Sequence, residues 1–205
     1  MPRPSQPLLS RENVAVTALR IIDEEGLDAL SLPRLAKDLS VRAPSLYHHF
    51  RDKAEILAEV ARLVVLETKY PRQKADEDWV EWFVALSLGL RRTILRHRNA
   101  APVLLQFLPR DVLVSRYERA ATVLEEAGVP AAQRVLILDG LEKLTLGGVL
   151  TEAMHQPSRN AGNVFPLADA AREPVLSESL AANPWNPEDL LAQAVRAFLH
   201  GATQT

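Results

Sequence analysis

Apolar residues recur along most of the chain at intervals of three and four, which is the spacing of one α-helix face, and few stretches alternate as strands do. Ser10, Ser31 and Asp52 each precede such a pattern as an N-cap would, and Gly26 follows the first pattern as a helix terminator would. The first third of the chain therefore predicts four helices, at about 11–25, 32–39, 45–50 and 53–68.

The rest of the chain predicts a helical bundle, with helices at about 79–98, 101–108, 112–127, 131–155 and 187–200. Residues 157–184 are rich in Pro, Asn, Gly and Ser, so we expect a loop with one helical turn there. The helix at 131–155 carries more apolar residues than one buried stripe requires. This surplus predicts that it packs, together with the last helix, against the copies of both in a homodimer.

These patterns predict an all-α fold in two parts. We expect an N-terminal three-helix domain, in which a helix-turn-helix binds DNA, and a C-terminal helical bundle for ligand binding and dimerisation. The proline-rich residues 1–9 predict a disordered arm. The DNA-binding domain is expected at 10–55, with the helix-turn-helix at 33–52, and the ligand-sensing and dimerisation domain at 56–205.

The charge distribution supports a DNA-binding surface in the first part. The whole chain has a formal net charge of −2, so it is not a general polycation. Between residues 31 and 53, however, five basic residues stand against two acidic ones. The basic residues are Arg34, Lys37, Arg42, Arg51 and Lys53. Because phosphate contacts supply much of the affinity for DNA, this local excess favours binding to double-stranded DNA.

Side chains of the third predicted helix suit contacts in the major groove. Ser45 and His48 can donate or accept hydrogen bonds at base edges and phosphates, and Tyr47 can reach a phosphate with its hydroxyl. Pro44 offers an apolar face to a thymine methyl group. Lys53, at a helix N-terminus, can hold a phosphate together with the free backbone N–H groups.

Other chemistries find little support. The chain has no cysteine, which excludes disulfides and thiolate metal sites. His48 and His49 are consecutive, so they point about 100° apart on a helix and cannot form one metal-binding face. We find no Gly-rich phosphate loop and no HExxH motif, and therefore expect neither an enzyme nor a metal or other cofactor. Without a signal-peptide pattern or a membrane span, we expect a cytoplasmic protein that does not contact a membrane.

A run of residues from the first helix to the fourth is typical of one family. It comprises Gly26-Leu27, Ser31, Leu35-Ala36, Leu39, Val41, Pro44-Ser45-Leu46-Tyr47-His48-His49-Phe50 and Lys53. This run resembles the DNA-binding domain of the tetracycline-repressor (TetR) family of transcriptional regulators. The resemblance implies that DNA is contacted by Ala43, Pro44, Ser45, Tyr47, His49 and Lys53. Ala43 is shorter than the Gln of tetracycline repressors, and Pro33 replaces a base-reading Arg, so a different operator is expected.

The C-terminal part is also similar to the tetracycline repressors, through Trp79, His97-Arg98, Pro109, Gly128 and Leu144-Thr145-Leu146-Gly147. By this resemblance, aliphatic residues replace a Phe, a metal-binding His and polar anchors of the drug. They are Leu86, Leu90, Leu104 and Ala120, and a further His position falls near Thr68. Trp82, Phe83 and Phe107 are expected to add aromatic walls. The resemblance implies a pocket for a largely apolar effector without metal, although these leucines could instead fill a solid core.

We therefore predict a dimeric repressor that a small, largely apolar molecule releases from a palindromic operator. Two alternatives from other classes remain open. One is a helical-bundle enzyme or ligand carrier whose N-terminal domain merely packs, which salt-dependent binding to sheared DNA would test. The other is a DNA-coating protein without an effector, which saturation of a single palindromic site and release by a compound would test.

Overall fold

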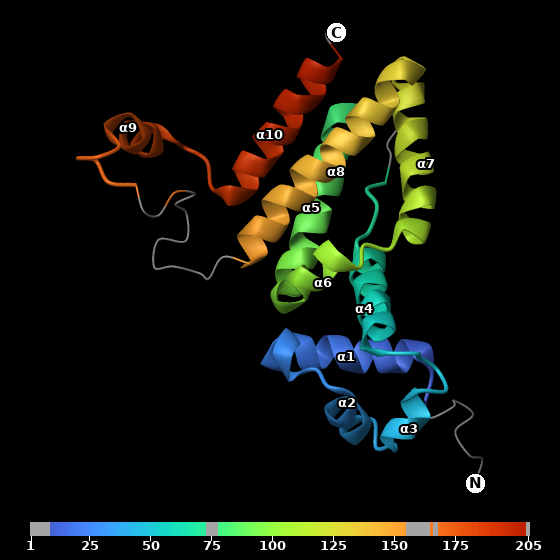
Figure 1. Ribbon diagram of the computed structural model, residues 1–205. Helices are drawn as coiled ribbons and strands as arrows, with labels where there is room; N and C mark the ends of the chain where they lie inside the picture. Colours follow the sequence, from blue (N-terminus) through green and yellow to red (C-terminus); the bar gives the residue numbers. More distant parts are fainter. Residues whose placement is uncertain (1–8, 73–77, 155–164, 166–167, 204–205) are drawn as a thin grey trace.

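The computed structural model describes residues 9–72, 78–154, 165 and 168–203. Regular structure in these residues is entirely helical, which confirms the predicted all-α fold (Figure 1). The elements are α1 (Arg11–Glu25), η1 (Leu27–Ala29), α2 (Leu32–Asp38), α3 (Ala43–Leu46), α4 (Lys53–Glu67), α5 (Trp79–Arg96), η2 (Arg98–Ala100), α6 (Ala101–Gln106), α7 (Arg110–Glu126), α8 (Ala131–Met154), α9 (Pro174–Ala182) and α10 (Pro187–Ala202). None of the helices described combines the length and the apolar content that a bilayer span needs.

Helix capping explains where several of these elements begin and end. Side-chain oxygens of Ser10, Ser31, Asp52 and Asn186 accept backbone N–H groups in the first turns of α1, α2, α4 and α10. These bonds satisfy donors that have no partner inside a helix, and those of Ser10, Ser31 and Asp52 confirm the predicted N-caps. Gly26 follows α1 with a φ of 90°, a backbone conformation that favours glycine.

The predicted bounds of the third helix are wrong. α3 covers four residues, Ala43–Leu46, although the sequence predicted 45–50. Proline is tolerated only in the first helical turn, so a helix that contains Pro44 must begin near it. After α3, single hydrogen-bonded turns, such as the bond from Phe50 N to Leu46 O (3.0 Å), lead the chain toward α4.

Two further predictions near the C-terminus need correction. The segment 157–184 is not only a loop with one turn, since its last part contains the nine-residue helix α9. Pro174 lies in the first turn of α9, where its missing N–H costs nothing, and Asn183 follows the helix as its C-cap. Gly201 lies inside α10 rather than after it, because Thr203 is the C-cap. Of the predicted arm at 1–9, only Leu9 falls within the described residues.

The helices α1–α3 lie at one end of the molecule, and α4 extends from them into the bundle (Figure 1). α4 packs against α1 on one side and against α5 and α6 on the other. A cluster of buried apolar side chains continues from α1–α4 into the base of the bundle, where it includes Ile94 and Val149. The predicted domain boundary between residues 55 and 56 falls inside α4, and the extent of the two domains stays a prediction.

A second apolar cluster fills the upper bundle between α5, α7, α8 and α10, with Trp82, Ile137 and Leu199 among its buried members. α10 packs against both α5 and α8. At Gly140 on α8, a Cβ atom would lie 2.2 Å from Cζ of Phe198 on α10. Glycine at this position therefore leaves the space that the phenyl ring occupies.

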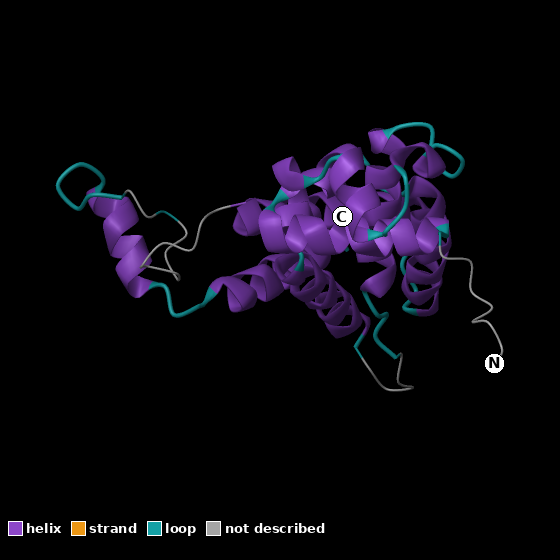
Figure 2. Ribbon diagram, turned by 90° about the horizontal axis from the view of Figure 1, so that it is seen from below, coloured by secondary structure: helices purple, strands orange, loops and turns teal. Residues whose placement is uncertain are grey.

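The helix α9 lies apart from the rest of the bundle in both views (Figures 1 and 2). None of its residues is buried, and Val175 is 76% exposed. Trp185, between α9 and α10, is 44% exposed. No residue of α9 belongs to either apolar cluster, so its position depends little on the core described above.

Candidate DNA interface and ligand cavity

The helix-turn-helix is held by a tight turn and by the underside of its two helices. Ser40 adopts a φ of 55°, and the next N–H, of Val41, donates to the carbonyl of Ala36 at 2.9 Å. Leu35 on α2 and Leu46 on α3 are buried in the first cluster. Because these apolar side chains point inward, the opposite face of α3 is left to solvent.

Most of the predicted DNA-binding residues lie on α3 or in the residues directly before and after it. Arg42, Pro44, Tyr47 and His48 are exposed, and the Tyr47 side chain is 57% exposed. Partial exposure is found for Ala43, Ser45, His49 and Lys53. Among the described residues, the side chains of Arg42, Tyr47, His48 and Lys53 have no hydrogen-bond or ion-pair partner. They are therefore available to a ligand outside the chain.

Arg34 differs from the other predicted DNA contacts. Its guanidinium binds the carboxylates of Glu25 and Asp38, and Arg20 also binds Asp38 at 2.5 Å. This network joins α1 to α2 and holds Arg34 in the scaffold of the domain. A DNA contact by Arg34 stays a prediction, and it would require the side chain to share or exchange these partners.

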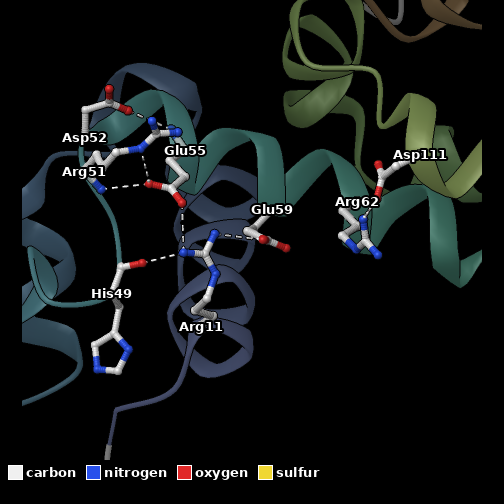
Figure 3. A network of polar contacts seen from close by, with 8 residues as sticks. All are labelled: Arg11, His49, Arg51, Asp52, Glu55, Glu59, Arg62 and Asp111. Carbon is white, nitrogen blue, oxygen red and sulfur yellow. Dashed lines mark hydrogen bonds and ion pairs between the residues drawn. The ribbon is translucent and has the colours of Figure 1, made fainter.

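An arginine at the start of α1 fixes the N-terminal end of α4 (Figure 3). Arg11 donates to Glu55 Oε1 and Glu59 Oε1, both at 2.9 Å, and to the carbonyl of His49. Its guanidinium also lies over the ring of Phe50, 4.3 Å from the centroid. The pKa of Arg11 is raised, chiefly by its hydrogen bond to Glu59. One side chain thus joins α1, the turn after α3, and two successive turns of α4.

Glu55 receives further hydrogen bonds at this end of α4. The backbone N–H of Arg51 donates to Glu55 Oε2 at 2.8 Å, while the N–H of Glu55 donates to Asp52 Oδ1 at 2.9 Å. The N–H of Glu55 bonded to Asp52 confirms the predicted N-cap, and the two bonds together resemble a capping box in which Arg51 rather than Asp52 is the backbone donor. The bond from Arg51 N–H and the bond from Arg11 lower the pKa of the Glu55 carboxyl.

A histidine at the end of α5 joins α1 and α4 at their other ends. Nδ1 of His97 lies 2.7 Å from Asp23 Oδ2, and Nε2 lies 2.7 Å from Glu67 Oε2. His97 is buried, and Glu67 also binds Arg96. The sequence shows only that this histidine precedes a short helix, so its role as a link between α1, α4 and α5 becomes visible only in the folded chain.

A cavity of about 120 Å³ lies between the two apolar clusters. Its lining comes from the C-terminal end of α4 and from α5, α7 and α8. The residues that line it are Val65, Thr68, Tyr70, Phe83, Leu86, Ser87, Leu90, Leu108, Leu113, Arg116, Tyr117, Ala120, Leu138, Leu141, Glu142, Thr145 and Leu146. The leucines of this region therefore do not fill a solid core.

The structure brings together four of the seven predicted pocket residues. They are Phe83, Leu86, Leu90 and Ala120.

The other three pocket residues lie elsewhere. Leu104 is buried in the first apolar cluster, and Phe107 packs against that cluster. Trp82 does not line the cavity; its Nε1 donates to the carbonyl of Pro71 at 3.2 Å, and its ring lies roughly perpendicular to that of Phe83, with 5.0 Å between the centroids. A shift of one residue turns a helical side chain by about 100°, which separates Trp82 from Phe83.

Several polar residues of the cavity were missed from the sequence. Arg116 and Tyr117 lie four and three residues before Ala120 on α7, and therefore face the same side of that helix. This spacing could have identified both residues. Thr68 and Tyr117 place buried hydroxyl groups at the cavity that have no partner in the structure. The hydroxyls of Ser87 and Thr145, by contrast, bond each other at 3.1 Å.

The described residues contain no group of three or more His, Cys, Asp and Glu side chains that could hold a metal ion. A DNA-facing helix-turn-helix, joined by one helix to a bundle with an internal cavity, is the architecture of a ligand-binding transcriptional regulator. Residues 16–60 match the bacterial regulatory proteins of the tetR family, and residues 70–197 match the tetracyclin repressor-like C-terminal domain. The chain belongs to the TetR family of DNA-binding transcriptional regulators.

Similar proteins are regulators as well. The chain is 27% identical over 194 residues to the tetracycline repressor protein class D of Escherichia coli, covering 94% of this chain and 85% of the relative. It is 30% identical over 145 residues to the class A repressor from transposon 1721 of E. coli, covering 70% and 67%. The structure of ActR from Streptomyces coelicolor in complex with actinorhodin superposes with a TM-score of 0.77, at 25% identity, and the match covers 95% of each chain.

Proposed function

We propose that this chain is a repressor that binds a palindromic operator as a homodimer and is released by a small, largely apolar effector without a metal ion. The observation that carries the proposal is the position of α4. This helix begins at the DNA-facing surface with Lys53 and ends at the cavity with Val65 and Thr68. A molecule in the cavity therefore contacts the same helix that adjoins the DNA.

The outer face of α3 would enter the major groove. Ala43, Pro44 and Ser45 would lie against base edges, and His48 could bond bases or phosphates. Arg42, Tyr47, His49 and Lys53 would contact phosphates or fix the orientation of the helix, with Arg34 joining them if it leaves its carboxylates. A DNA-binding regulator works where the DNA is, so we place this one in the bacterial cytoplasm.

Pairing of two chains through α8 and α10 would supply the symmetry that a palindrome requires. On α8, Val135 and Leu136 are exposed by 72% and 55%, although the helix also buries Ile137 and Leu141. A helix that is apolar on more than one side is stabilised by a second partner. Packing of α8 and α10 against their copies as a four-helix bundle would cover these side chains.

The effector is expected to differ from metal-bound tetracycline. Leu86, Leu90 and Ala120 line the cavity, and burying a polar chelate against them would leave its polar groups unpaired. ActR, whose structure was solved with actinorhodin, supports the idea that this fold can hold other ligands. A few buried aliphatic contacts of roughly 1.5–3 kcal/mol each suffice for micromolar binding.

Transmission to the DNA would run through α1 and α4 as one unit. Arg11 joins the two helices near the DNA, and His97 joins them near the cavity. A ligand can shift the spacing of the two DNA-binding domains only if it binds one arrangement of α4 more tightly than the other. Contact with Thr68 at the end of α4 offers such a difference.

Gel shifts on the promoters of its own and adjacent genes, at two salt concentrations, test DNA binding. Lys53→Ala should weaken binding to all sequences and reduce the salt slope by about one, while Tyr47→Ala should cost more on the operator. Lys69→Ala is the matched control, because Lys69 is an exposed lysine beyond the opposite end of α4. Absence of any salt-sensitive complex would contradict the proposal, as would a monomer by light scattering at micromolar concentration.

A second experiment tests release by an effector. A thermal-shift screen of apolar compounds, run with and without EDTA, should give hits that dissociate the operator complex. Leu90→Asp should abolish release and leave operator binding intact, whereas Leu105→Asp, at a leucine that is 61% exposed, should change neither. Tight binding of magnesium–tetracycline that is lost on chelation would overturn the metal-free effector.

A further inference from the structure

Two residues of the cavity lining carry hydroxyl groups that have no hydrogen-bond partner among the described residues. These groups are Oγ1 of Thr68, whose residue is 3% exposed, and the phenolic oxygen of Tyr117. Buried polar groups are nearly always paired, because an unpaired one loses its bonds to water without replacement. Both residues line the cavity, so a ligand there lies beside both of them.

The cavity also holds a guanidinium without a counter-ion. In the described part of the chain, no carboxylate lies within ion-pair distance of Arg116, which bonds the carbonyl of Leu66 at 3.4 Å and lies 5.1 Å from the centroid of the Tyr70 ring. Burial lowers the pKa of Arg116, but an arginine stays protonated in proteins. The carboxylate of Glu142 also lines the cavity, and it already accepts from Arg110 at 3.0 Å.

The two unpaired hydroxyls and the guanidinium come from α7 and the end of α4. Arg116 and Tyr117 are neighbours on α7, and Thr68 is the C-cap of α4. The apolar wall is formed by Phe83, Leu86, Leu90, Leu138 and Leu141 from α5 and α8. A ligand that satisfies both the polar groups and the apolar wall has an apolar body and one acidic group.

We propose that the effector is an amphipathic organic anion, whose carboxylate is held by Arg116 with the hydroxyls of Thr68 and Tyr117 and whose apolar body lies against α5 and α8. This inference rests on the proposed function and narrows its largely apolar effector. A guanidinium matches the two oxygens of a carboxylate, and hydroxyl groups can donate to the same oxygens. A neutral hydrocarbon would leave both hydroxyls unpaired and Arg116 without a counter-ion, and a cation would be repelled by Arg116.

Matched acids and amides test the charge requirement. The probes are benzoate with benzamide, and 2-naphthoate with 2-naphthamide, which have nearly the same shape but differ in charge. Isothermal titration of the full-length protein should show at least one acid binding about tenfold or more tightly than its amide. Arg116→Met should remove this preference and leave amide binding unchanged.

Two further variants keep the test independent of folding defects. Arg119→Met is the matched control, because Arg119 also lies near the Tyr70 ring, at 5.9 Å, but does not line the cavity. It should retain the preference for the acid. Tyr117→Phe removes only a hydroxyl and should weaken acid binding several-fold.

The inference is overturned if neither acid binds, if an amide binds as tightly as its acid, or if Arg116→Met keeps the preference. Operator complexes measured in the same samples separate this result from the proposed function. If only a neutral compound releases the operator, the proposed function as a ligand-controlled repressor stands, and the proposal of an anionic effector is wrong. If the acid binds but leaves the operator complex unchanged, the cavity accepts an organic anion, but this anion does not regulate DNA binding.

Discussion

The two ends of α4 differ in how completely their polar groups are paired. At the N-terminal end, Glu55 and Glu59 are bound by Arg11, and Asp52 caps the helix. At the C-terminal end, the hydroxyl of Thr68 is buried without a partner beside a cavity. At the first end these carboxylates are paired within the chain, and Lys53 has no partner among the described residues and faces outward, whereas the second end has room for a further molecule inside the protein.

This difference suits a helix that transmits a signal. The end near the DNA must keep α1 and α4 together, so that any movement of α4 carries the helix-turn-helix with it. The end near the cavity must respond to occupancy, which requires a contact that forms only when a ligand is bound. Packing follows the same division, since Leu46 is 1% exposed in the first cluster while Leu90 borders empty space.

The largest expected effect compares leucine truncations at the two ends. Leu46→Ala should lower the free energy of unfolding by about 3–5 kcal/mol, because it leaves a cavity in a filled core. Leu90→Ala should lower it by less than about 2 kcal/mol, because one side of Leu90 already lacks packing partners. Urea unfolding at one fixed protein concentration measures both. Equal losses would show that the cavity end is packed as tightly as the other.

A smaller effect of opposite sign is expected at the unpaired hydroxyl. Thr68→Val keeps the shape of the side chain and removes an unsatisfied buried oxygen, so it should stabilise the ligand-free protein by about 1–2 kcal/mol. Thr145→Val is the control, because it breaks the bond to Ser87 and should destabilise. Thermal unfolding measures both variants. If the unfolding temperatures of Thr68→Val and Thr145→Val shift in the same direction, the predicted difference between the paired and the unpaired hydroxyl is wrong.

Much of the DNA-binding end could be predicted from sequence, because its signals are local. Ser31 and Asp52 cap helices within three residues, and Pro44 lies near the start of α3. The junctions could not be predicted in the same way. Arg11 and Glu59 are 48 residues apart, and His97 and Asp23 are 74 apart. Such pairs depend on tertiary packing, which the periodicity of apolar residues along the sequence does not reveal.

The cavity was predicted only in part, for a geometric reason. The resemblance gave positions along the chain, but the rotation of each helix decides which side chains face inward. Leu86 and Leu90 are four apart on α5 and both line the cavity, while Leu104 on the short helix α6 faces the core. Arg116 had no counterpart in the expected pocket, so neither its charge nor its missing partner entered the prediction of an apolar effector.

A further effect, of about 1 kcal/mol, is expected at the junction near the DNA. Arg11→Met keeps most of the apolar stem but removes the donors to Glu55 and Glu59, so it should destabilise by this amount, because the Arg11 side chain is partly exposed. Arg51→Met, at a side chain that is 89% exposed, should change stability by much less. Urea midpoints compare the two, and equal losses would mean that Arg11 adds nothing beyond a surface ion pair.

The smallest effect is a change in the titration of Glu55. Its pKa is lowered in the folded chain, first by the N–H of Arg51 and then by Arg11, so Glu55 binds protons less readily when folded than when unfolded. Its contribution to stability is therefore present above the unfolded pKa and is lost as the pH falls through the lower, folded pKa. Arg11→Met should raise the pKa toward its ordinary value but not reach it, because the bond from Arg51 remains. NMR titration of the Glu55 carboxyl measures this shift, with Glu81, whose pKa is lowered by Arg196 on α10, as an unchanged reference. If Arg11→Met leaves the pKa of Glu55 unchanged, the bonds between residues 51, 52 and 55 alone hold this end of α4, and Arg11 is not needed to join α1 to it.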